Sequence, residues 1–171
     1  MGRKGLGVKN HQVFFVFMIH PSIDFFIPLH GQGVRLRACL RLREFFRIHH
    51  WTFLNTCLKN YMLNKWAMEL GISAEISPKV LFMHTTGVVI GDGTVLKNGV
   101  KIYSHVVLGR KNVENINDYP VVEENCILGT GCRVLGAVTI GAGAIIGANA
   151  VVLSDCESGG TYVGIPARRI K

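Results

Sequence analysis

The sequence has few prolines, no closely paired cysteines and no long uninterrupted apolar run. Its 171 residues include five prolines and five cysteines. No two cysteines form a Cys-x-x-Cys pair, so we predict neither a disulfide framework nor a zinc site. The apolar stretch 13–29 is interrupted by His20-Pro21 and Asp24 and lacks a small-residue cleavage site. It is a poor transmembrane span and a poor signal peptide, and we expect a cytoplasmic protein.

Acidic residues are scarce in the first part of the chain. Residues 1–70 contain ten Lys/Arg and three Asp/Glu, a balance of +7, whereas residues 71–171 contain nine and eight, a balance of +1. A basic surface attracts nucleic acid, anionic lipid or acidic glycans, although a solvated helix face has the same composition. We expect no nucleic-acid partner, and we keep peripheral contact of this basic segment with a membrane as an open alternative.

Glycine, by contrast, is abundant at 20 residues and falls within a six-residue repeat. The first position of each hexad is aliphatic in two runs: Ile90, Leu96, Ile102 and Leu108, then Val122, Leu128, Val134, Ile140, Ile146 and Val152. The fifth position is small or β-branched: Thr94, Val100, Val106, Cys126, Cys132, Val138, Ala144, Ala150 and Cys156. Glycine commonly occupies the second or fourth position.

This period of six excludes the ordinary elements. It does not match the 3.6-residue period of a helix, and the glycines would break a long strand. A triangular solenoid accommodates it, because each hexad supplies one short face and one corner, and three hexads make a coil. We therefore predict a mainly β fold, a left-handed parallel β-helix of hexapeptide repeats.

The repeat also predicts the domain organisation. The frame of the first run extends upstream to Pro78 and Ile72, so we place the β-helix domain at residues 71–171, with a C-terminal tail. Residues 110–120 are polar and lack the repeat, which indicates a loop that leaves one corner of the solenoid, here called the excursion loop. Such loops often carry function, although simple tolerance of insertions is the alternative.

The preceding segment, residues 1–70, is expected to be basic and largely helical. Residues 34–70 contain no glycine or proline and are rich in good helix formers. We expect one or two helices that bury one apolar side and cap the open end of the solenoid. The apolar positions are Leu36, Leu40, Phe46, Phe53, Leu54, Leu58, Met62 and Trp66. Residues 1–32 have no clear period, which fits either a poorly ordered segment or an upstream start-site choice.

One histidine stands out in the solenoid. In the extended frame His84 occupies the first position of a hexad, where later repeats have an aliphatic residue. An imidazole near neutral pH can act as a general base at a coil edge, unless the first coils are simply irregular. His105, at a fourth position, is the alternative base. Glu75 is the nearest upstream carboxylate that could fix the imidazole tautomer, with Asp92 and Asp118 as substitutes.

Three motifs carry a family resemblance. They are HTTG followed by VVIG at 84–91, the series GTGCRVLGAVTIGAGAIIGANAVV at 129–152, and VGIPAR at 163–168. Over residues 75–171 the chain resembles the hexapeptide-repeat acyltransferases. Within them it is similar to the serine acetyltransferase branch and to the capsule or O-antigen O-acetyltransferases that share its motifs.

The resemblance implies a catalytic pair and an assembly. The histidine of the H-x-T-G motif deprotonates the acceptor hydroxyl in the family, which implies that His84 is the catalytic base. Glu75-Ile76-Ser77-Pro78 matches the family's D/E-I-x-P element, which lies about one hexad further upstream in relatives. The resemblance also implies a homotrimer with each active site between two subunits.

Acetyl-CoA is the co-substrate that the resemblance implies, with no metal. Its pantetheine would lie along a coil edge and its phosphates near the basic tail. The cofactor-binding residues implied are Gly129, Gly131, Gly147 and Ala148 for the pantetheine, and Arg168 and Arg169 for the phosphates.

Two departures from the family pattern concern the acceptor. Met83 stands where serine acetyltransferases carry an acid before the catalytic histidine, and Asp118-Tyr119 replaces an Arg-His pair in the excursion loop. The loss of a cation disfavours serine and favours a sugar or polysaccharide precursor. The candidate acceptor-binding residues are Asp92, His105, Asp118 and Tyr119.

Two other classes of function were weighed. A metal enzyme of the γ-carbonic-anhydrase type needs three histidine ligands, and only His84 and His105 lie in the solenoid. A non-catalytic β-helix scaffold or binding protein is the stronger alternative to the O-acetyltransferase, because the solenoid begins irregularly and its loop is substituted.

Overall fold

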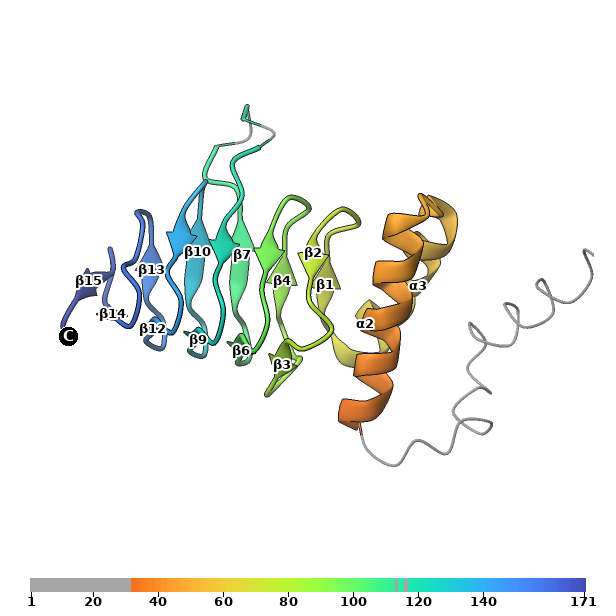
Figure 1. Cartoon of the computed structure of the whole chain (residues 1–171), viewed down its shortest axis with the longest axis horizontal. Coiled ribbons are helices and arrows are strands. Elements are labelled where there is room, and N and C mark those ends of the chain that lie inside the picture. The colour runs from red at the N-terminus through yellow and green to blue at the C-terminus, as the bar shows by residue number, and fades with distance from the viewer. Residues whose placement is uncertain (1–31, 113, 116) are drawn as a thin grey trace, which may run out of the picture.

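The structure is a computed structural model that describes residues 32–112, 114–115 and 117–171. The expectation for residues 1–31 lies outside this part of the chain. Two helices, α2 (Gln32–Ile48) and α3 (Thr52–Trp66), are followed by fifteen short strands. The strands stack into a solenoid with the helices at one end and the C-terminus at the other (Figure 1).

The strands form three sheets, each of which collects one face of successive coils. Sheet A contains β1 (Glu69–Leu70), β4 (Val89–Ile90), β7 (Val107–Gly109), β10 (Arg133–Leu135) and β13 (Val151–Val152). Sheet B contains β2 (Glu75–Ile76), β5 (Val95–Leu96), β8 (Val121–Val122) and β11 (Thr139–Ile140). Sheet C contains β3 (Leu81–Phe82), β6 (Lys101–Ile102), β9 (Ile127–Leu128), β12 (Ile145–Ile146), β14 (Thr161–Val163) and β15 (Arg168–Arg169).

Parallel pairing links the coils, and three edges separate the sheets. Val89 and Ile90 of β4, for example, lie in register with Val107 and Leu108 of β7. The one antiparallel pair among the described strands is β14 with β15. We call the turns that lead from sheet C to sheet A (83–88, 103–106, 129–132 and 147–150) the C–A edge. The turns from A to B (71–74, 91–94, 110–120 and 136–138) form the A–B edge, and those from B to C form the B–C edge.

The hexad pattern from residue 90 onward predicts the core correctly. Every first-position aliphatic residue from Ile90 to Val152 is at most 2% exposed, and every fifth-position residue is also buried. Each fills the interior of the prism, where it replaces contact with water by contact with the coils above and below. The parallel β-helix that the repeat predicts is therefore confirmed.

The upstream extension of that frame is wrong. The interior of the first coil is formed by Leu70 and Ile76, with Phe82 partly buried against the core. Phe82 and Ile90 are eight positions apart instead of six, so two extra residues shift the frame between β3 and β4. His84 consequently lies in the widened turn and is exposed, not inside the solenoid.

The two helices pack against the first coil (Figure 1). The apolar face of α2 contributes Leu36, Leu40 and Phe46, and that of α3 contributes Leu58, Met62 and Trp66. The helix α3 ends at Trp66, and its C-cap residue Ala67 adopts a left-handed conformation and donates its N–H to the Leu63 carbonyl. Phe53 is the exception to the predicted apolar side, since it is 77% exposed.

A buried arginine closes the open end of the solenoid. Arg43 is 1% exposed and donates to the carbonyl oxygens of Ala74 (2.9 Å), Gly71 and Ile72 (3.3 Å). Asn55 donates a further hydrogen bond to the Ile72 carbonyl at 3.0 Å. These carbonyls belong to the first coil, which has no earlier coil to pair with, and leaving them buried and unpaired would be costly. Burial lowers the pKa of Arg43 to about 10.

No helix in the described part of the chain combines the length and apolar character that a membrane crossing requires.

Candidate active site

His84 lies at the start of the C–A edge, directly after β3. Its side chain is exposed, and the ring of Tyr103 from the next coil lies 6.2 Å away, centroid to centroid, tilted by 54°. Among the residues that the structure describes, none forms a hydrogen bond to the His84 ring. The turn is held by the Gly87 N–H, which donates to the Ala67 carbonyl at 2.9 Å. The fold therefore fixes the backbone of His84 and leaves both ring nitrogens available.

A cavity of about 280 Å³ opens beside His84. Its walls come from α2 and α3, which together form the helical cap of the solenoid, from the end of β3 and from the turn itself. The lining residues are Leu36, Trp66, Phe82, Met83, His84, Thr85 and Thr86. A second cavity of about 190 Å³ shares Leu36, Phe82 and Met83 with the first and adds Arg37, Leu40, Val80 and Leu81. The two cavities border one another along α2, so the helical cap that closes the solenoid also forms one wall of the space next to the imidazole.

His105 occupies the same edge, one coil further on. Its N–H donates to the Thr86 carbonyl at 2.9 Å, and its left-handed φ of 58° places the ring against Gly87. A methyl group at Gly87 would collide with this ring. The structure thus brings the two predicted histidines to adjacent coils of one edge. Tyr103, whose ring lies beside that of His84, has no sequence signal, because in the repeat it occupies an ordinary outward-facing position.

Glu75 is not brought to His84 within one chain. It lies on β2 of sheet B, where its carboxylate accepts a hydrogen bond from Arg47 of α2 at 3.3 Å. Leu36, at the other end of the same helix, borders the His84 cavity. Eleven helical residues separate Leu36 from Arg47, which corresponds to roughly 16 Å at 1.5 Å per residue. Glu75 therefore serves the attachment of the helical cap.

Glu69 is the carboxylate that the topology brings closer to the turn of His84. Its N–H donates to the Val88 carbonyl at 2.8 Å, so β1 lies next to the end of the His84 turn. Its side chain is half-exposed and pairs with Lys59 of α3 at 3.3 Å. Glu69 stands six residues before Glu75. The family's D/E-I-x-P element lies about one hexad upstream of Glu75 in relatives, so this spacing is the sequence signal that could have indicated Glu69 as a candidate.

The predicted acceptor residues other than His105 lie on the A–B edge. Asp118 accepts hydrogen bonds from the backbone N–H groups of Ala137 (2.7 Å), Lys111 (3.0 Å) and Asn112 (3.1 Å). These bonds, led by that from Asn112, lower the pKa of the Asp118 carboxyl. The carboxylate closes the base of the excursion loop, so its charge is compensated by its own chain.

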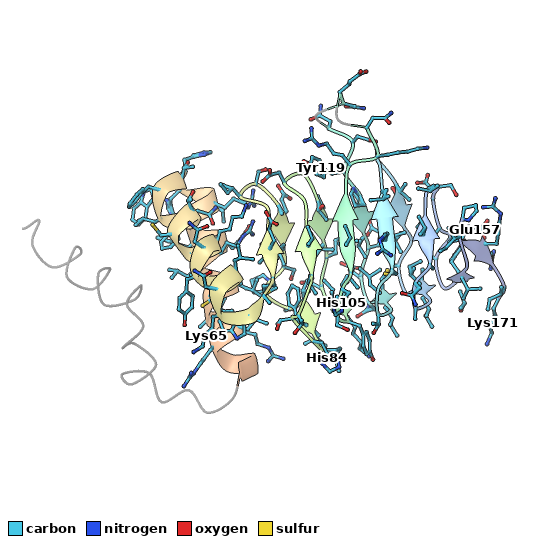
Figure 2. The ribbon with its side chains drawn as sticks, turned by 180° about the vertical axis from the view of Figure 1, so that it is seen from behind. Lys65, His84, His105, Tyr119, Glu157 and Lys171 are labelled. Atoms are coloured by element: carbon cyan, nitrogen blue, oxygen red, sulfur yellow. The ribbon has the colours of Figure 1, made fainter. Side chains whose placement is uncertain are left out.

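Tyr119 and Asp92 also make contacts within the chain. The Tyr119 ring covers Gly91 and Gly93, where a methyl group would collide with it, and the Arg110 guanidinium lies 5.5 Å from the ring centroid. Asp92 is joined to Ser73 of the first coil, whose hydroxyl donates to the Asp92 carbonyl at 2.9 Å. Tyr119 and His84 lie on opposite sides of the solenoid (Figure 2).

The predicted pantetheine residues continue the edge that carries the histidines. The Gly131 N–H donates to the Ser104 carbonyl (2.9 Å), and the Asn149 N–H to the Thr130 carbonyl (2.8 Å), so the turns stack as one column. Gly129 and Gly147 allow this stacking, because a methyl group at either would collide with the following coil. Thr130 and Ala148 are exposed on the outside of the column, which leaves a shallow surface lined by small residues.

The basic tail ends near this column. Arg168 and Arg169 of β15 are both exposed, but they differ in their contacts. Arg169 forms an ion pair with Glu157, whereas the Arg168 guanidinium donates to the neighbouring Ala167 carbonyl at 3.1 Å. Arg133, the first residue of β10, is a further cation directly after the C–A edge that the sequence motifs do not indicate, and it donates to the Gly131 carbonyl at 3.1 Å.

The described residues contain no group of three or more His, Cys, Asp or Glu side chains arranged to hold a metal ion.

The fold and the column of turns define a hexapeptide-repeat protein, and comparison with known proteins agrees. Residues 119–154 match the family model described as bacterial transferase hexapeptide (six repeats). A serine acetyltransferase of Buchnera aphidicola is 33% identical over 133 residues, which cover 73% of this chain and 48% of the relative. The serine acetyltransferase of Bacillus licheniformis is 39% identical over 101 residues, covering 59% and 47%.

Solved structures extend the similarity to the helical cap. A truncated serine acetyltransferase apoenzyme superimposes with a TM-score of 0.77 at 27% identity, covering 91% of this chain and 68% of that one. A serine acetyltransferase in complex with CoA gives a TM-score of 0.74 at 30% identity, covering 83% and 58%. The left-handed hand of the predicted β-helix is confirmed by these relatives.

The chain belongs to the hexapeptide-repeat transferase family, in its serine acetyltransferase-like branch. It spans about half the length of the curated relatives that it matches.

Proposed function

We propose that this protein is an acetyl-CoA-dependent O-acetyltransferase in which His84 is the general base. The observation that carries the proposal is the position of His84. An exposed imidazole without a hydrogen-bond partner among the described residues stands at a cavity, on the edge whose later turns are lined by small residues. The serine acetyltransferase relatives, one of them solved with CoA, support both the reaction and the thioester substrate.

The chemistry follows from these groups. His84 removes the proton of the acceptor hydroxyl while its oxygen forms a bond to the thioester carbonyl carbon of acetyl-CoA. Backbone N–H groups of the edge stabilise the resulting oxyanion. The carbon–sulfur bond then breaks, and the imidazolium returns its proton to the departing thiolate. The products are the acetyl ester and CoA thiol, and His84 is regenerated.

A base of this kind needs an acceptor for its second ring nitrogen. We assign this role to Glu69, because its strand is hydrogen-bonded to the end of the His84 turn. The family element that carries the orienting carboxylate lies about one hexad upstream of Glu75, which is the position of Glu69. Glu69 would leave its exposed pair with Lys59 for this contact, and such a pair contributes at most about 1 kcal/mol.

A homotrimer is the assembly that completes this site. His84 and His105 lie on the C–A edge, whereas Asp118 and Tyr119 lie on the A–B edge of the same chain (Figure 2). The excursion loop therefore reaches a histidine only when a second copy places its A–B edge against the C–A edge of the first. Cyclic assembly of three prisms forms three such contacts.

Serine is the acceptor that the relatives support, and a sugar hydroxyl is the second candidate. The cavity beside His84 is lined by Leu36, Trp66 and Met83 among others and contains no Lys, Arg, Asp or Glu within the described chain. A neutral acceptor fits it directly. The α-carboxylate of serine would have to reach Arg37 in the bordering cavity.

Release of CoA thiol from acetyl-CoA tests the proposal. We expect release that depends on a hydroxyl acceptor, and comparison of L-serine with nucleotide sugars and oligosaccharides identifies the class. Arg37→Gln should raise KM for serine and leave KM for a neutral sugar unchanged. CoA binding without acceptor-dependent thiol release, or no CoA binding at all, would instead favour the non-catalytic scaffold.

A further inference from the structure

The outer face of α2 presents an unusual combination of apolar and basic side chains. Arg37, Arg41, Phe45 and Ile48 follow one another at intervals of four, four and three residues, so they lie on a single stripe. The stripe is opposite the buried face that carries Leu36, Leu40 and Arg43. Phe45 is 45% exposed and Ile48 is 59% exposed.

The stripe continues around the turn between the helices. The ring centroids of Phe45 and Trp51 are 5.6 Å apart, and Phe45 also lies 4.3 Å from the His49 ring. Trp51 is 45% exposed and Phe53 77% exposed. Contiguous exposure of large apolar side chains on this scale marks a contact surface. We call the set Phe45, Ile48, Trp51 and Phe53 the hairpin tip.

Positive charge dominates the same surface. The only acidic residue in α2 and α3 is Glu44, and both of its oxygens are engaged by Arg47. Arg37 and Arg41 are exposed next to the hairpin tip. A second copy of the same face would therefore oppose arginine with arginine, with no acid on the helices to compensate them. The charge favours an anionic partner.

We propose that the hairpin tip and the adjacent arginines bind an anionic phospholipid membrane. Trp, Phe and Ile insert at the boundary between headgroups and acyl chains, while the arginines contact the phosphates. The described helices are not long and apolar enough to span a bilayer, so the helical hairpin rests on one leaflet. Arg37 also lines the cavity that borders the His84 cavity, whereas Arg41 and the hairpin tip line neither of these two cavities. The membrane contact through Arg41 and the hairpin tip therefore does not depend on the proposed transfer reaction.

Tryptophan fluorescence tests this directly, because the chain contains two tryptophans and Trp66 is buried. In the full-length Trp66→Phe variant, emission reports on Trp51 alone. We expect vesicles that contain phosphatidylglycerol to shift this emission to the blue and brominated lipid to quench it, whereas vesicles of pure phosphatidylcholine should do neither. Flotation with the vesicles should give the same order.

Substitutions separate the two components of binding. Arg41→Gln should weaken binding about fivefold, since an arginine near an anionic surface contributes about 1 kcal/mol. Phe45→Ser with Phe53→Ser should abolish quenching by brominated lipid. The matched control, Lys79→Gln, removes the same charge from an exposed position of the solenoid and should change binding less than twofold.

Three outcomes overturn the proposal. The first is unchanged Trp51 emission and no flotation with phosphatidylglycerol vesicles. The second is a blue shift that depends on protein concentration alone, with a larger particle in sedimentation, which would identify a second copy as the occupant. The third is an emission that is already blue in dilute protein and insensitive to brominated lipid, which would show that another segment of this chain covers the tip.

Discussion

The two edges of sheet A use polar residues in opposite ways. On the A–B edge, Asp118 receives three backbone N–H groups, Asp92 is tied to the first coil and Tyr119 covers two glycines. On the C–A edge, His84 is exposed and Ala148 lies on a column of small residues. The two edges thus differ in whether their polar side chains make contacts within the chain. Side chains that make none remain available to a substrate, and this is why we place the candidate site on the C–A edge.

Removal of the His84 imidazole should break this comparison most strongly. We expect His84→Ala to lower kcat by about 10²–10⁴-fold, the usual contribution of a general base, in a thiol-release assay. The exposed ring supports no described hydrogen bond, so the fold and CoA binding should remain. The matched control is His105→Ala, an exposed imidazole on the same edge, for which we expect less than a tenfold loss. A parental rate in His84→Ala would refute the assignment.

Two glutamates six residues apart sharpen the comparison further. Glu69→Gln should lower kcat roughly tenfold to a hundredfold, less than the loss of the base itself. The carboxylate would orient the imidazole and stabilise the imidazolium that forms during transfer, and the thiol-release assay measures its loss.

Glu75→Gln is the matched control for that pair. It breaks an exposed contact with Arg47, so unfolding free energy should fall by at most about 1 kcal/mol and the rate should stay parental. A parental rate in Glu69→Gln, together with a lowered rate in Glu75→Gln, would reverse the assignment.

The C–A edge, with the B–C edge as its control, offers a test of the proposed acetyl-CoA surface. Ala148→Tyr places a ring on the column of small residues and should raise KM for acetyl-CoA about tenfold, with kcat little changed. Ala142 is equally exposed on the B–C edge, and Ala142→Tyr should leave KM unaltered. Equal effects in both variants would argue that the co-substrate does not lie along the C–A edge.

The sequence predicts the regular coils well and the first coil poorly, for a physical reason. From Ile90 onward each hexad has one aliphatic residue that only the interior can accept, so the register is unambiguous. Before it, Leu70 and Ile76 occupy the interior positions that the extrapolated frame gives to Ile72 and Pro78, each two positions later. The two-residue insertion after Phe82 has no distinctive composition that would reveal it in the sequence. Extrapolation of the frame therefore turned His84 inward.

The sequence likewise predicts only part of the candidate site. His84 was indicated by its position in the repeat and by a motif, and the small residues of the column were indicated by the family resemblance. The pairing of Glu75 with Arg47 could not be predicted from the sequence, because it depends on where α2 crosses the first coil. The buried position of Arg43 has the same cause, since its carbonyl partners exist only once an open coil end has formed.

The smallest expected effect concerns the A–B edge, where Asp118 accepts its hydrogen bonds, and it depends on pH. The folded pKa of Asp118 is lowered, chiefly by the Asn112 N–H. The carboxylate therefore stabilises the closed loop fully above its unfolded pKa of about 3.9, and the stabilisation is lost as the pH falls through the lower folded value.

Hydrogen exchange of the Asn112 and Ala137 amides should accelerate over that acid range relative to the interior amides of the solenoid. In Asp118→Asn the same amides should exchange faster at neutral pH, and the acid transition should disappear. A transition that persists in the variant would assign the loop's pH response to another group, and the contrast between the two edges would then lose its electrostatic basis.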